Sequence, residues 1–76
     1  MGLNQKLIDL RTQKGLSQEA VAEQAGISRV YYTMIENGTK CPAPKVAKSI
    51  AKVLGIEWTI FFPSFHLAHF SNYKLH

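Results

Sequence analysis

The sequence has a single cysteine and three histidines, which limits the chemistry open to it. Cys41 has no second cysteine with which to form an internal disulfide, and this usage is typical of a reducing compartment. His66 and His69 are close in sequence, but two ligands do not make a metal site and no third is evident. No Ser/His/Asp, Cys/His or paired-carboxylate arrangement is suggested either. We therefore expect no enzyme activity, no metal site and no cofactor.

Long apolar runs are also missing, both of membrane-spanning length and of the signal-peptide kind. We therefore expect a cytoplasmic protein with no membrane contact, and no pattern indicates a small-molecule ligand. At 76 residues the chain is one domain, near the lower limit of what folds without disulfides or metals. Its hydrophobic content of 46% is that of a globular chain.

Acidic residues are absent from residues 37–52, a stretch that contains Lys40, Lys45, Lys48 and Lys52. The whole chain has a net charge of +4. A run of this kind is most often a solvated lysine face, but it also suits a phosphate backbone. The motif beside the run favours the phosphate interpretation.

That motif is a pair of short helices joined by a tight turn, between Ser17 and Gly38. Ser17 is a good N-cap for a helix over 18–25, and Gly26 supplies turn angles at no steric cost. Ser28 then caps a second helix over 29–36, which ends before Gly38. A helix, a short turn and a second helix form the helix-turn-helix pattern.

Three further helices are expected around this pair. Leucines spaced by four and three predict a first helix over 4–14, with Asn4 as its cap. A helix over 44–54 follows, less firmly capped because Ala43 has no acceptor oxygen. A short helix over 57–62 completes the set. We therefore predict an all-α fold of five helices, with the second and third forming the helix-turn-helix.

The ordered residues of this region resemble the DNA-binding regulators of phage-repressor type (Cro/CI and the xenobiotic-response-element class). The residues that carry the resemblance are Ser17-Gln18-Glu19, Ala22, Ala25-Gly26-Ile27-Ser28, Ile35-Glu36 and Gly38, continued by Pro42 and residues 50–56. The resemblance covers about residues 3–62. We therefore expect a DNA-binding domain over 1–62 and an aromatic tail over 63–76 for packing or dimerisation. It also implies a bacterial or phage-encoded protein, and a partly buried ion pair between Arg11 and Glu36. Two unrelated solvated charges are the alternative to that pair.

The expected DNA contacts follow from the inward direction of Tyr32 and Ile35, which turns the opposite face of helix 29–36 outward. Arg29 suits either paired hydrogen bonds to guanine or a phosphate contact, while Val30 or Met34 suits a thymine methyl group. Gln18 would hold a phosphate or a nearby base, and Lys40 would reach the backbone. The predicted DNA-binding residues are Gln18, Ser28, Arg29, Val30, Tyr31, Thr33, Met34, Asn37, Thr39 and Lys40.

The predicted function is sequence-specific binding of double-stranded DNA by a transcriptional regulator, a repressor acting as a homodimer. The surplus of large apolar groups predicts the dimer. Its candidate contacts are Trp58, Phe62, Phe65 and Phe70. The alternative is a protein-interaction module of the same fold, antirepressor-like or antitoxin-like, with weak DNA binding. The apolar outward face of helix 29–36 and the aromatic tail favour that alternative, and the basic charge opposes it. The sequence leaves the operator and the regulated genes open.

Overall fold

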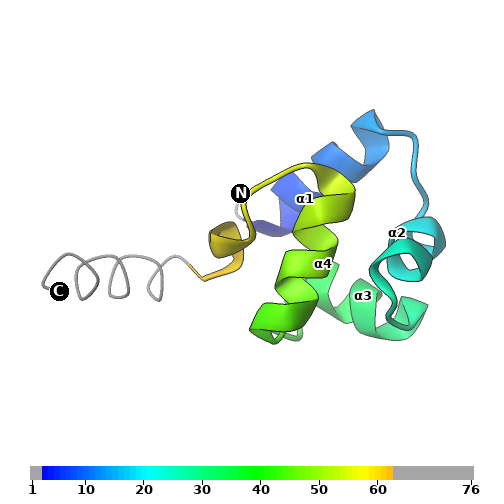
Figure 1. Cartoon of the computed structure of the whole chain (residues 1–76). Helices are drawn as coiled ribbons and strands as arrows, with labels where there is room; N and C mark the ends of the chain where they lie inside the picture. Colours follow the sequence, from blue (N-terminus) through cyan, green and yellow to red (C-terminus); the bar gives the residue numbers. More distant parts are fainter. Residues whose placement is uncertain (1–2, 63–76) are drawn as a thin grey trace, which may run out of the picture.

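The computed structural model describes residues 3–62, which form four α-helices and one short 3₁₀ helix (Figure 1). No strand occurs in this part of the chain. The elements are α1 (Leu3–Gln13), α2 (Gln18–Ala25), α3 (Arg29–Glu36), α4 (Pro44–Leu54) and the 3₁₀ helix η1 (Trp58–Phe61). The described part is all-helical, as predicted, but it has four α-helices where five were expected.

The fifth expected helix, over 57–62, is only the single turn η1. Glu57 precedes this turn without a side-chain cap, so the turn begins weakly. Pro63 follows Phe62 in the sequence, and a residue before proline is disfavoured in the helical region. Phe62 has φ −134° and ψ 69°, outside that region. The proline therefore limits η1 to one turn.

The first helix begins and ends one residue earlier than predicted, so Asn4 lies inside α1 and does not cap it. The Asn4 side chain instead lies close to Gly38, just after α3. Gly38 has φ +84°, and a Cβ built there would collide with the Asn4 amide. The backbone angle favours glycine at this position, whereas the exposed Asn4 side chain could move aside for a larger residue.

The core is formed where α2 packs against α3 and α4, and where η1 covers α4. Ala22, at 2% exposure, keeps α2 close to its neighbours, because a larger side chain would push the helices apart. The buried hydrophobic residues are Leu7, Val21, Ala22, Tyr32, Ile35, Ala47, Ile50, Ala51, Leu54 and Phe61. The core therefore holds α2 and α3 together and leaves one side of α3 at the edge of the molecule (Figure 1).

Over residues 3–62, no helix is both long enough and apolar enough to cross a membrane.

Candidate nucleic-acid interface

Two serine caps and a glycine turn fix the angle between α2 and α3. The Ala20 amide donates to Ser17 Oγ, and the Tyr31 amide donates to Ser28 Oγ, each at 3.0 Å. Gly26 ends α2 in the left-handed conformation at φ 77°. Ser28, predicted also as a DNA contact, is exposed and has its oxygen engaged in this cap.

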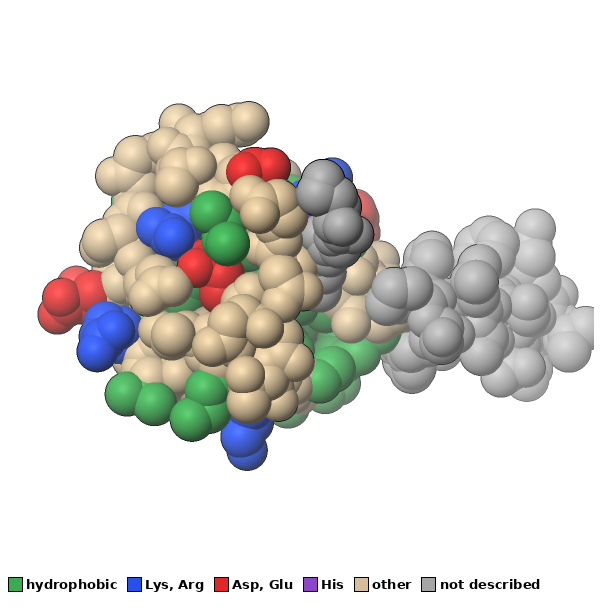
Figure 2. Space-filling model, turned by 180° about the vertical axis from the view of Figure 1, so that it is seen from behind, with side chains coloured by type: hydrophobic (Ala, Val, Ile, Leu, Met, Phe, Trp, Pro, Cys, Tyr) green, Lys and Arg blue, Asp and Glu red, His purple; other side chains and the backbone are tan. Residues whose placement is uncertain are grey.

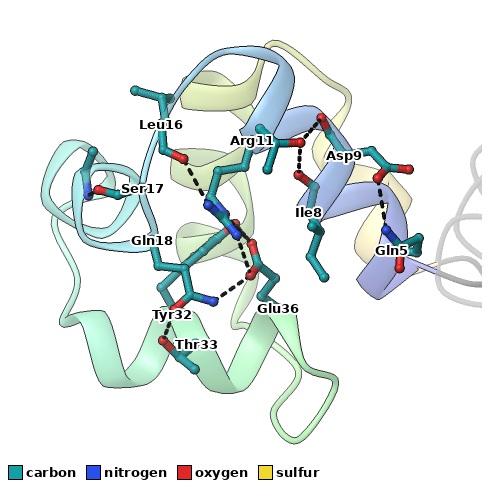
Figure 3. A network of polar contacts seen from close by, with 12 residues as sticks. Gln5, Ile8, Asp9, Arg11, Leu16, Ser17, Gln18, Tyr32, Thr33 and Glu36 are labelled. Atoms are coloured by element: carbon teal, nitrogen blue, oxygen red, sulfur yellow. Dashed lines mark hydrogen bonds and ion pairs between the residues drawn. The ribbon is translucent and has the colours of Figure 1, made fainter.

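The Glu36 carboxylate accepts hydrogen bonds from three helices at the base of α3 (Figure 3). From α1, Arg11 Nε donates to Glu36 Oε2 at 2.7 Å, and Arg11 Nη2 donates to Oε1 at 3.2 Å. From α2, Gln18 Nε2 donates to Oε1 at 2.6 Å; from α3, the Tyr32 hydroxyl donates to Oε2 at 2.9 Å. Arg11 Nη1 also donates to the Leu16 carbonyl at 2.9 Å. The network joins α1, α2 and α3 at one buried charge.

The ionisation of these groups follows from their contacts. Burial alone would raise the pKa of Glu36, but hydrogen bonds from Arg11, Gln18 and Tyr32 outweigh it and hold that pKa below its ordinary value. The hydrogen bond to Glu36 raises the pKa of Arg11. Burial, followed by the hydrogen bond to Glu36, raises the pKa of the Tyr32 phenol well above its usual range. At neutral pH the site therefore holds a charged carboxylate, a guanidinium and a neutral phenol.

Gln18 was predicted as a DNA contact, and the structure places it between the buried charge and the outer face of α3. Its Nε2 donates to Glu36, and its Oε1 accepts from Thr33 Oγ1 at 3.0 Å (Figure 3). Both ends of the amide are therefore engaged within the protein. Thr33 itself is half-buried on the side of α3 that carries the other predicted contacts.

The outward face of α3 combines one charge with apolar surface. Arg29 is exposed. Val30 is 57% exposed, and among the described residues no other large hydrophobic side chain is classed as exposed. Tyr31 and Met34 are half-buried. Figure 2 shows hydrophobic and basic side chains side by side along the lower edge of the molecule, where α3 and the start of α4 lie in Figure 1.

Acidic residues border one end of this face. Glu19 and Glu23 of α2 line a hollow of about 320 Å³ together with Ala22, Ile27 and Arg29. Carboxylates beside Arg29 oppose the approach of a phosphate at that end of α3.

The loop after α3 leaves Lys40 exposed. Asn37 Oδ1 accepts from the Thr39 amide at 3.0 Å and from the Thr39 hydroxyl at 2.6 Å, so these two predicted contacts are bonded to each other. Lys48, another lysine of the acid-free stretch, lies over the Trp58 ring with Nζ at 4.9 Å from the ring centroid. Both lysines are exposed, but Lys48 lies against η1 and Lys40 lies just after α3.

Two of the predicted dimer contacts lie within the described residues. Trp58 and Phe62 are half-buried, and their rings meet edge to face at 6.0 Å between centroids. Phe65, Phe70, His66 and His69 lie outside the described residues, as does the whole expected tail over 63–76.

Sequence reasoning missed two members of the Glu36 network. Tyr32 lies four residues before Glu36 on one helix. Side chains at this spacing are neighbours, so the sequence contained a signal for this contact. Gln18 had no such signal, because the proximity of its amide to both Glu36 and Thr33 depends on the angle between α2 and α3.

Two short helices at a fixed angle, with one face of the second at the surface, define a helix-turn-helix protein. Residues 7–61 match a protein family described as helix-turn-helix, and the chain belongs to this family. The two relatives described below are a transcriptional regulator and a transcriptional repressor by name.

Two relatives and one solved structure illustrate the similarity. The uncharacterized HTH-type transcriptional regulator YqaF of Bacillus subtilis strain 168 is 58% identical over 52 residues, 68% of each chain. The transcriptional repressor RstR of the cryptic phage CTXphi, from Vibrio cholerae, is 35% identical over 67% of this chain and 46% of its own. The N-terminal DNA-binding domain of SinR from Bacillus subtilis has a TM-score of 0.69 at 25% identity, covering 80% of this chain and 91% of that one.

Proposed function

We propose that this chain is a sequence-specific transcriptional regulator, a repressor that binds double-stranded DNA as a homodimer in the cytoplasm. Residues 1–62 would form the DNA-binding domain, and residues 63–76 would contribute to packing or dimerisation. The observation that carries the proposal is the position of α3, whose outward face is exposed while its inner face is fixed by the core and by Glu36.

In this mechanism α3 enters the major groove, with its N-terminal residues facing base edges. Arg29 is exposed at the first turn, where a guanidinium can donate two hydrogen bonds to guanine. The neighbouring carboxylates of Glu19 and Glu23 favour a base contact over a phosphate contact for this arginine. Val30 and Met34 suit thymine methyl groups, and the Tyr31 hydroxyl would reach a phosphate from the groove edge. Lys40 follows α3 and suits the phosphate backbone.

The test is a salt titration of DNA binding by the full chain and two variants. Lys40→Ala should weaken binding to all sequences alike and reduce the slope of log K against log salt by about 1, because one phosphate contact is lost. Arg29→Ala should lose discrimination at one base pair, by about 1–3 kcal/mol. Lys14→Ala is a matched control, because Lys14 lies near Gly55, in the loop at the edge of the molecule opposite α3 (Figure 1). It should leave the slope unchanged.

The exposed Val30 side chain favours a second candidate, a protein-interaction module of the same fold with weak DNA binding. A module of this kind would show weak affinity for every sequence and no preferred site in a selection from random DNA. A preferred site that depends on Arg29 supports the regulator, whereas uniformly weak binding supports the interaction module.

A further inference from the structure

The hydrogen-bond network fixes the direction in which the Gln18 amide points. Glu36 is ionised and paired with Arg11, so its oxygens act only as acceptors. The group that faces Glu36 Oε1 at 2.6 Å must therefore be the NH₂ of Gln18. A flipped amide would place a carbonyl oxygen against a carboxylate oxygen, which leaves both without a proton between them.

The direction of the amide decides where the Thr33 proton lies. With its NH₂ toward Glu36, Gln18 presents its carbonyl oxygen to Thr33 Oγ1 at 3.0 Å. A carbonyl cannot donate, so the hydroxyl must give its only proton to Gln18. Half-buried Thr33 can therefore offer a DNA base oxygen lone pairs and a methyl group, but no proton to donate.

A group without a donor discriminates between the partners that DNA offers. Phosphate oxygens and the guanine N7 and O6 atoms are acceptors, so they gain no hydrogen bond from Thr33. In the major groove, the amino groups of adenine (N6) and cytosine (N4) are donors. We propose that Thr33 recognises a base pair by accepting from an adenine or cytosine amino group, and that Gln18 is the positioning residue that sets this polarity.

This inference rests on the proposed function, since it requires α3 to lie in the major groove. It differs from the expected role of Gln18 as a direct contact to phosphate or base. In the proposal, Gln18 links the buried Glu36 charge to the outward face of α3. Through this one amide, Glu36 determines whether Thr33 donates or accepts a hydrogen bond.

The experiment is a selection of bound sites from random DNA, with the full chain and three variants. Thr33→Val keeps the shape of the side chain and removes the oxygen, so it should lower discrimination at one base position by roughly fivefold, the effect of one neutral hydrogen bond. Thr33→Ser is the matched control, because it keeps the hydroxyl and should retain the preference. Gln18→Met frees the proton of the Thr33 hydroxyl. The selected sites should then also contain, at the same base position, bases that present a hydrogen-bond acceptor. The preference at the base pair contacted by Arg29 should persist in all three variants, which would show that each variant is folded.

Three results would overturn the proposal. One is an unchanged preferred sequence in Thr33→Val. Another is binding that is weaker by the same factor for all sequences, which would make Thr33 a phosphate contact. The third is an unaltered preference at this position in Gln18→Met. In each case the wild-type chain still binds a preferred site and the proposed function stands. Only a wild-type chain without salt-dependent DNA binding would overturn both.

Discussion

At the scale of single residues, Glu36 places a full charge at 2% exposure in a small all-helical core. A buried carboxylate is costly unless it is paired and hydrogen-bonded. Arg11, Gln18 and Tyr32 meet that requirement from three different helices. Because these donors come from α1, α2 and α3, keeping the charge satisfied also keeps the three helices in one arrangement.

A double-mutant cycle tests the coupling within this pair. Arg11→Met should cost about 3 kcal/mol in the free energy of unfolding, because it leaves the Glu36 charge without its guanidinium. Arg11→Met combined with Glu36→Leu should recover part of this loss, since no buried charge is then unpaired. Denaturant unfolding of the four proteins gives the coupling energy, expected at roughly 1–3 kcal/mol. Strictly additive losses would mean that the two side chains do not interact in solution.

The lowered pKa of Glu36 predicts a loss of stability in acid. Above about pH 4.5, the ordinary pKa, the carboxylate is ionised in both the folded and the unfolded chain and stabilises the fold in full. Below that pH the unfolded chain takes up a proton first, so stability falls until the folded carboxyl is protonated. The urea concentration at the unfolding midpoint should be measured above and below this pH. It should decrease less on acidification in Glu36→Gln than in the wild type.

Glu23→Gln is the control for that series, because it removes one exposed carboxylate from α2, outside the network. An acid dependence that is the same in Glu36→Gln and in the wild type would show that other groups cause the acid unfolding.

How far the sequence predicts these contacts differs from residue to residue. The pairing of Arg11 with Glu36 followed from family resemblance, because nothing in a separation of 25 residues indicates a contact. The inward direction of Tyr32 followed from helical spacing. The position of Gln18 depends on a crossing angle between helices that no local pattern encodes, and it was expected to face DNA.

At the scale of elements, the helix bounds that were predicted correctly are those with strong local signals. The N-caps Ser17 and Ser28 and the glycine stops at Gly26 and Gly55 mark α2, α3 and the end of α4. The start of α1 and the length of η1 have weaker signals, and the predictions differed from the structure there. Backbone angles and side-chain caps are local, so they can be predicted from sequence, whereas the close approach of Asn4 to Gly38 is tertiary.

The start of α4 offers a test of this local rule. Ala43 occupies the N-cap position with extended angles, φ −65° and ψ 156°, and gives no side-chain cap. Because these angles already suit a capping residue, Ala43→Ser should raise the free energy of unfolding by about 1 kcal/mol. Ser28→Ala, which removes an existing cap, should lower it by a similar amount. Denaturant unfolding measures both, and a serine without effect at position 43 would show that water satisfies these amides equally well.

At the scale of the whole molecule, the residues proposed for DNA binding and those proposed for dimerisation lie at two different ends. The proposed DNA-contacting face lies on α3, with Lys40 just after it, while η1 with Trp58, followed by Phe62, lies on the far side of α4 (Figure 1). The order of motifs along the chain separates the helix-turn-helix from the aromatic residues in sequence, but it does not place them in space. The sequence could not predict that Lys48 lies over Trp58, because that contact depends on how η1 folds back on α4.

This division predicts how two copies would bind DNA. One copy presents one α3 and therefore reads one half-site, whereas a homodimer formed through Trp58, Phe62 and the expected tail would present two. Two recognition helices in successive major grooves on one face of DNA lie about 34 Å apart, one helical turn. We expect selected sites to contain paired half-sites, and sedimentation velocity to show two protein copies per DNA. Inserting about five base pairs, half of one turn, should place the half-sites on opposite faces and remove cooperative binding, while inserting about ten should restore much of it. Single half-sites, together with a monomer at high protein concentration, would contradict the dimer and leave α3 to act alone.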